Sequence, residues 1–236
     1  MKNILILLFS VFFIGQSYSQ TIILPVVNIK SHKTLTIEKI EFSENQTLIF
    51  LSIENQKTEG EAWFCADEKI YIKNTQGTEM YYMTKSEGIP TCPEKYKFNK
   101  PGEVLQFKLI FPKIPANIKE IDIVENCTDN CFYFYGVILD AAQNADIKLF
   151  EKGVTLYTNK KLDEAVKCFL ELTANINDKK SNIYGYSLYF IPLIYFEKGD
   201  KENAKKEYAK LVNSSITDKG YFIEKLSKEE FFKNLK

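Results

Sequence analysis

Between residues 34 and 139, hydrophobic and polar residues alternate or form short apolar runs that end at turn residues. In the clearest example, Leu105, Phe107 and Leu109 alternate with more polar neighbours, which predicts a strand with one buried face. The predicted strands are Leu35–Phe42, Leu48–Ile53, Ala62–Cys65, Ile70–Lys73, Glu79–Thr84, Val104–Phe111, Ile118–Val124 and Cys131–Leu139. Short strands at this spacing predict an antiparallel β-sandwich of immunoglobulin-like architecture.

Polar turn residues separate two pairs of these strands. The segments 43–46 and 74–77 predict hairpin turns. A true immunoglobulin domain would place its Trp between the paired cysteines, on a separate strand. Here Trp63 lies two residues before Cys65. We therefore expect the sandwich architecture of an immunoglobulin domain but not its Trp and disulfide arrangement.

From Asp140 onward the hydrophobic period becomes helical. The predicted helices are Ala141–Tyr157, Leu162–Asn175, Ile183–Glu197 and Asp200–Asn213. A last short helix is expected to start at Ser227, where Ser227 and Glu230 match a capping box. The sequence therefore predicts an all-β domain followed by an all-α domain. The expected divisions are a signal peptide at 1–19, an N-terminal segment at 20–33, a β-sandwich at 34–139 and a helical domain at 141–236.

The helical part carries one residue pattern twice. The first copy is Leu149, Gly153, Leu156, Ala165 and Phe169; the second, with identical spacing, is Leu188, Pro192, Tyr195, Ala204 and Tyr208. This pattern resembles the tetratricopeptide repeat, in which small residues let two antiparallel helices approach closely. It departs from the family at Lys152 and Pro192 and in lacking the closing Pro. The N-terminal half resembles sandwich domains of uncharacterised exported bacterial proteins.

The resemblance implies protein binding, because such hairpins stack and present a concave surface. Groove positions of the family fall here on Ile147, Phe150, Val154, Tyr157, Tyr186, Tyr189, Leu193 and Phe196. The protein-binding residues we expect are the aromatic members of this set, Phe150, Tyr157, Tyr186, Tyr189 and Phe196. The alternative is that the sandwich domain or the final helix covers them.

The N-terminus has the pattern of a secretory signal peptide. Lys2 precedes an apolar core, and small residues surround Ser19, after which cleavage is expected. The apolar run is too short to span a bilayer comfortably, and no later segment is long and apolar enough. We expect a soluble periplasmic or secreted protein.

Export to an oxidising compartment favours disulfides among the four cysteines of the N-terminal half. Four cysteines permit three connectivities; we favour Cys127 with Cys131 and Cys65 with Cys92. Cys168 shares an apolar helical face, which favours a buried free thiol. A redox-active Cys127–Cys131 pair is the alternative to a structural link, but such pairs normally have two intervening residues at a helix N-terminus.

The charges balance, with 31 Lys+Arg and 31 Asp+Glu, and every basic residue is Lys. The sequence therefore offers neither a positive field nor an arginine fork for nucleic acid. The single histidine, His32, falls in a polar stretch that predicts a solvated linker. We assign no catalytic residue, cofactor or metal ligand.

These features favour an exported, non-enzymatic binding protein whose partner is another exported or envelope protein. An alternative is a carbohydrate-associated module that stacks sugars on aromatic residues of the sheet face. Its candidate residues are Trp63, Tyr81, Tyr82, Tyr133 and Tyr135. A third hypothesis is a thiol-redox enzyme. The sequence predicts neither the partner nor the oligomeric state.

Overall fold

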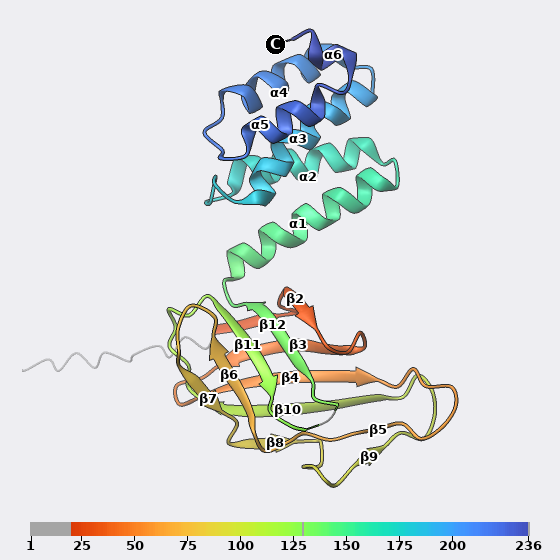
Figure 1. Cartoon of the computed structure of the whole chain (residues 1–236), viewed down its shortest axis with the longest axis vertical. Coiled ribbons are helices and arrows are strands. Elements are labelled where there is room, and N and C mark those ends of the chain that lie inside the picture. The colour runs from red at the N-terminus through yellow and green to blue at the C-terminus, as the bar shows by residue number, and fades with distance from the viewer. Residues whose placement is uncertain (1–19, 129, 236) are drawn as a thin grey trace, which may run out of the picture. The chain divides into compact units, whose positions relative to one another are not determined.

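The computed structural model describes residues 20–128 and 130–235, and it forms two compact units that divide between Val137 and Ile138 (Figure 1). The first unit consists of antiparallel sheets and the second of helices, so the predicted fold class is confirmed. The predicted signal peptide, residues 1–19, and its cleavage site after Ser19 lie outside the described residues.

The first unit contains two five-stranded sheets, ordered β1-β3-β4-β10-β8 and β2-β12-β11-β6-β7, and a two-stranded sheet, β5-β9. The strands are β1 (Gln20–Ile23), β2 (Val27–Lys30), β3 (Leu35–Phe42), β4 (Gln46–Glu54), β5 (Trp63–Phe64), β6 (Ile70–Asn74), β7 (Met80–Tyr82), β8 (Lys85–Glu87), β9 (Tyr96–Lys97), β10 (Val104–Pro112), β11 (Glu120–Glu125) and β12 (Tyr133–Ile138).

The core of this unit lies between the inner faces of the two large sheets. On β10 the alternating residues Leu105, Phe107 and Leu109 are buried, as their spacing predicts. The ring of Phe64, on β5, lies 5.9 Å from that of Phe107 and 5.9 Å from that of Phe132. Phe64 therefore joins side chains that belong to opposite sides of the sandwich.

The sequence pattern predicts a separate N-terminal segment at 20–33. In the structure this segment instead contributes β1 and β2 to the two large sheets. β1 pairs with β3, with Ile22 opposite Ile40, and β2 pairs with β12, with Ile29 opposite Tyr135. Both strands have only 4 residues and form sheet edges, so their alternation is too short to recognise. The very short strands β8 and β9 escaped prediction for the same reason.

The second unit contains six described helices: α1 (Ala141–Thr158), α2 (Leu162–Asn175), α3 (Asn182–Glu197), α4 (Lys201–Asn213), α5 (Lys219–Leu226) and α6 (Glu230–Lys233). The first four agree with the predicted ranges to within one residue at either end. Side-chain caps set two of the starts. Asp140 accepts hydrogen bonds from the first-turn amides of α1, and Asp200 accepts one from Asn203 N at 3.1 Å in α4.

Gly153 lets α1 approach α2 closely. A Cβ atom at this position would lie 2.8 Å from Cε1 of Phe169 on α2. Phe169 cannot easily yield, because it is fully buried and its ring stacks on Phe190 of α3 with centroids 4.9 Å apart. The contact between the first two helices thus continues into the third.

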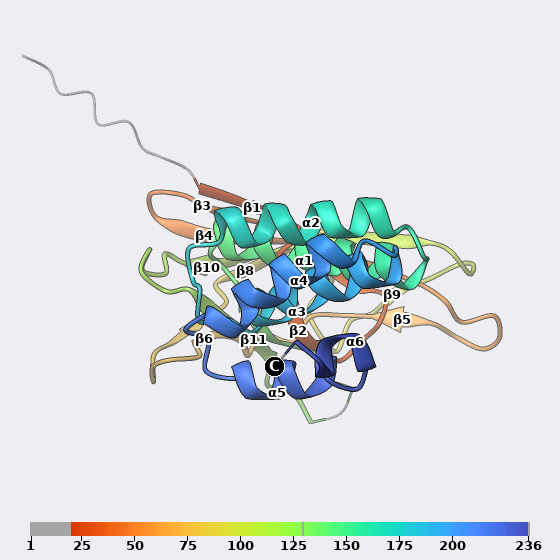
Figure 2. The same ribbon diagram turned by 90° about the horizontal axis from the view of Figure 1, so that it is seen from above.

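The end of the chain differs from prediction. α5 was not expected, and Ser227 is its C-cap rather than the N-cap of a following helix. The Ser227 hydroxyl donates to the Ile223 carbonyl at 2.7 Å, one turn back, so the predicted capping box is wrong. In Figure 2, α5 and α6 lie along α3 and α4 on the side away from α2. Their buried residues Phe222, Leu226 and Phe232 extend the helical core.

We predict that Gly153→Ala destabilises the helical unit by about 1–2 kcal/mol. The helix-propensity gain of about 1 kcal/mol is outweighed by overpacking against Phe169. Overpacking usually costs about 1–3 kcal/mol, and we expect about 2–3 kcal/mol here because the Phe169 ring is fully buried and stacked on Phe190. Gly220→Ala is the matched control, because a Cβ there meets nothing within 4 Å, and it should stabilise α5 slightly. Urea unfolding followed by far-UV circular dichroism measures both. A Gly153→Ala protein as stable as the parent would contradict the close approach.

Candidate functional site

Four of the five predicted binding residues gather on one surface of the helical unit, which we call the aromatic face: Phe150 and Tyr157 of α1, and Tyr186 and Tyr189 of α3. All four are half-buried. The ring of Phe190 lies at their centre, 5.2 Å from Tyr157 and 5.3 Å from Tyr189. Phe150 and Tyr186 are 6.3 Å apart across the two helices. The sequence pattern missed Phe190, whose role depends on the packing of α3 against α1 and α2.

Charged groups and phenol hydroxyls share this face. The Tyr157 hydroxyl donates to the carboxylate of Glu197, and burial, reinforced by that carboxylate, raises the pKa of Tyr157. Burial also raises the pKa of Tyr189, while Lys225 lies 5.9 Å from its ring. At neutral pH these phenols are therefore uncharged hydrogen-bonding groups beside one acidic and one basic side chain. This mixture of rings and polar groups is typical of binding surfaces.

The last helices contact part of the predicted surface. Phe222 of α5 lies 4.9 Å from Tyr186 and 6.0 Å from Tyr189. Phe196, the fifth predicted residue, is not on the aromatic face. Its ring stacks on Phe231 of α6 at 5.2 Å and also contacts Phe232. α5 therefore borders the aromatic face, whereas α6 uses Phe196 as a packing contact.

The aromatic residues proposed for a sugar platform are divided by the structure. Tyr133 and Tyr135 lie on the outer face of β12 and stack with centroids 4.6 Å apart. Tyr82 lies on the same face of this sheet and contacts Tyr71 at 5.8 Å. Tyr81, by contrast, is opposite the buried Ile72 and therefore shares the inner face. The outer face thus carries two ring pairs, Tyr71–Tyr82 and Tyr133–Tyr135, in which Tyr82 and Tyr135 are exposed and Tyr71 and Tyr133 half-buried.

Trp63 lies on β5, outside both large sheets, next to the disulfides. The disulfides are Cys65–Cys92 and Cys127–Cys131, the pairing that the sequence favoured. The second bridges the end of β11 and the start of β12 and does not lie at a helix N-terminus, which favours a structural link. Cys168, on α2, is a buried free thiol whose pKa is raised by burial.

The Glu125 carboxylate accepts hydrogen bonds from backbone amides near both disulfides. Its two carboxylate oxygens accept the amide of Asp67 at 2.8 Å and that of Phe132 at 2.9 Å. Burial raises the pKa of Glu125, the largest influence on this carboxyl. A cavity of about 270 Å³ lies here, lined by Trp63, Lys95, Glu125, the Cys65–Cys92 disulfide and Cys127.

A larger cavity, of about 530 Å³, lies beside Trp63 in the same unit. Its walls include His32, Gln56, Phe64 and Phe98. His32 is therefore not the solvated linker residue that the sequence predicted. It is half-buried, its ring meets Phe64 edge-on at 6.1 Å, and the Ser31 hydroxyl lies 2.8 Å from Nδ1.

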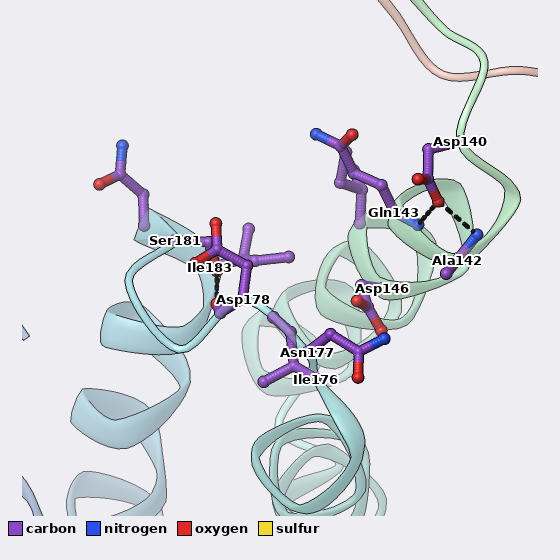
Figure 3. Close-up of a pocket in the computed structure, with 11 residues that line it drawn as sticks. Asp140, Ala142, Gln143, Asp146, Ile176, Asn177, Asp178, Ser181 and Ile183 are labelled. Atoms are coloured by element: carbon purple, nitrogen blue, oxygen red, sulfur yellow. Dashed lines mark hydrogen bonds between the residues drawn. The ribbon is translucent and has the colours of Figure 1, made fainter. Parts of the chain in front are cut away.

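A third cavity, of about 360 Å³, lies where α1 begins and α2 connects to α3 (Figure 3). Two of its three carboxylates, those of Asp140 and Asp178 but not Asp146, already accept backbone hydrogen bonds. Asp140 accepts the amide of Ala142 at 3.0 Å, and Asp178 accepts the amide of Lys180 at 2.9 Å. In residues 20–128 and 130–235, no group of three or more His, Cys, Asp or Glu side chains is arranged to hold a metal ion. This cavity therefore gives no functional assignment.

We predict that the His32 imidazole titrates below its usual pKa of about 6.5, because burial disfavours the charged ring. The folded protein then binds this proton less readily than the unfolded chain. Stability should consequently fall as the pH drops from about 6.5 through the folded-state pKa. Because His32 is the single histidine, histidine-selective NMR gives the value directly. A His32 pKa at or above the value in urea-unfolded protein would contradict its burial.

No helix in the part of the chain that the structure describes is long and apolar enough to cross a membrane. No protein-family model matches this chain, and no curated protein matches its sequence.

Proposed function

We propose that this chain is an exported, non-enzymatic scaffold that binds another exported or envelope protein through tetratricopeptide-like hairpins. The repeat pattern and the helix packing support the proposal. Gly153 and Ala204, small residues of the two pattern copies, are both buried in their hairpins. Gly153 meets Phe169, the last aromatic position of the first copy. The contact of Gly153 with Phe169 supports the proposed resemblance in the first hairpin.

The observation that carries the binding role is the aromatic face. Its rings form a connected set that reaches from α1 through α3 to Phe222 on α5. Tyrosine is enriched at energetic centres of interfaces because a rigid ring adds apolar area and its hydroxyl adds a hydrogen bond. Here three half-buried phenols lie beside Glu197 and Lys225. A peptide with apolar and polar side chains fits such a surface better than a purely apolar ligand.

The proposed location rests on the disulfides and the N-terminal sequence. Two disulfides among the described residues fit an oxidising compartment outside the cytoplasm. Residues 1–19 have the composition of a secretory signal peptide. A partner that meets this chain in that compartment is itself exported or belongs to the cell envelope.

We predict that Tyr189→Ala weakens partner binding by about 1–3 kcal/mol, the usual range for a truncated aromatic anchor. Placing a photo-crosslinking amino acid at Tyr157 of the full chain, in its native host, would identify the protein in contact. Binding of that protein is then compared between the parent, Tyr189→Ala and Lys206→Ala. The last is the control, an exposed residue of α4 outside the aromatic face. Equal affinities for all three proteins would contradict a binding role for this face.

Carbohydrate association by the first unit is the second candidate function. One observation favours it: the stacked pair Tyr133–Tyr135 lies on the outer sheet face, where Tyr135 is 39% and Tyr82 56% exposed. Flat, accessible rings of this kind suit the apolar face of a sugar. The neighbouring Asp122 and Lys73, paired across β11 and β6, would supply hydrogen bonds.

We predict that Tyr135→Ala abolishes any glycan-array signal given by this face, whereas Tyr189→Ala leaves it unchanged. The two variants separate the sheet-face proposal from the protein-binding proposal, because they lie in different units. A signal that Tyr135→Ala and Tyr82→Ala together leave at full strength would show that the sheet-face tyrosines do not bind the sugar.

A further inference from the structure

The cavity beside Trp63 has the size and lining of a ligand site. Its volume of about 530 Å³ falls within the range of small-molecule sites, about 300–1,000 Å³. Four rings contribute to the walls, those of His32, Trp63, Phe64 and Phe98. They come from the β2–β3 connection, from β5 and from the residue after β9. The fold therefore collects aromatic residues at one place from distant parts of the sequence.

Polar groups at the same cavity are neutral or balanced in charge. Gln56 is exposed and presents an amide, and Glu54 and Lys57 bring one charge of each sign. The Asn55 side chain makes its hydrogen bonds within the protein, because it donates to the Lys100 carbonyl and accepts the Lys57 amide. It holds the 55–57 backbone in place. The cavity thus offers ring faces and hydrogen bonds without net charge.

Trp63 lies at the boundary of this cavity and the smaller one, which also share Phe64 and Asn130. Trp63 lines both, whereas Lys95, whose Nζ lies 3.7 Å from the ring centroid, lines only the smaller. Lys95 therefore lies over the indole at the smaller cavity and is not among the residues that line the larger one. Trp63 is 39% exposed, so part of the indole is accessible to a ligand.

We propose that this cavity binds a neutral saccharide, with a sugar ring stacked on Trp63 and its hydroxyls hydrogen-bonded by Gln56 and His32. A pyranose has one apolar C–H face and a rim of hydroxyls, which matches rings surrounded by uncharged donors and acceptors. A charged ligand would meet opposite charges on Glu54 and Lys57. A purely apolar ligand would gain no hydrogen bond from the Gln56 amide. This site is distinct from the aromatic face and from the sheet-face tyrosines.

Trp63 is the single tryptophan of the sequence, so its fluorescence reports on this site directly. The full chain is titrated with neutral hexasaccharides of glucose, mannose, galactose or N-acetylglucosamine, and with a heparin-derived hexasaccharide. We expect a saturable change in Trp63 emission with at least one neutral sugar. Gln56→Ala should weaken that binding about tenfold, the effect of one lost hydrogen bond. Ala62→Leu, which fills the cavity from its wall, should abolish it.

Tyr135→Ala is the matched control and should bind the sugar like the parent, since Tyr135 lies on the outer sheet face. Circular dichroism of every variant confirms that the fold is intact; a misfolded Ala62→Leu is replaced by Ala62→Val. The proposal is overturned by the absence of a saturable response to every neutral sugar, or by a response to the charged sugar alone. It is equally overturned if the response persists in the filled cavity. None of these results bears on protein binding by the aromatic face.

Discussion

The close contact of α1 with α2 over Gly153 determines where the aromatic side chains of the helical unit lie. Without a Cβ at this position, the Phe169 ring fits against α1 and stacks on Phe190. Phe190 in turn sets the positions of Tyr157 and Tyr189 around it. A helical hairpin cannot bury its apolar surface alone. Here Phe222 of α5 packs on the first half of α3, and Phe231 and Phe232 of α6 pack on its last turn.

The first unit is organised around Phe64, which contacts Phe107 of β10 and Phe132, the residue that precedes β12. Because Phe64 alternates with Trp63 on the same short strand, burying one residue directs the other outward. The Cys65–Cys92 disulfide follows immediately and ties this strand to the chain before β9. The exposure of Trp63 is thus a consequence of core packing, and a ring held at the surface in this way is preorganised for a ligand.

Local patterns predicted the parts of the fold that local physics controls. The strand at 35–42 and the helix at 162–175 match the structure to the residue, because each has a full period of buried positions. The sequence could not show that Tyr71 joins Tyr82 or that His32 faces Phe64, since sheet register and loop path bring them together. The sequence pattern did not predict α5. This helix is stabilised by the packing of Phe222 in the helical core, which the sequence does not show, and Ser227 matches the pattern of a helix start although it ends α5. Spacing alone grouped Phe196 with the binding residues, and only the position of α6 separates it.

Because Cys168 is a free thiol, chemical labelling of this residue can measure how often the helical unit opens. The four other cysteines are joined in disulfides, and the Cys168 thiol is buried between helices. A thiol reagent can therefore reach it only when α2 separates from its neighbours. When closing is faster than labelling, the labelling rate is proportional to the population of the open form. One sulfur atom thus measures how often this unit opens, independently of the stability of the sandwich.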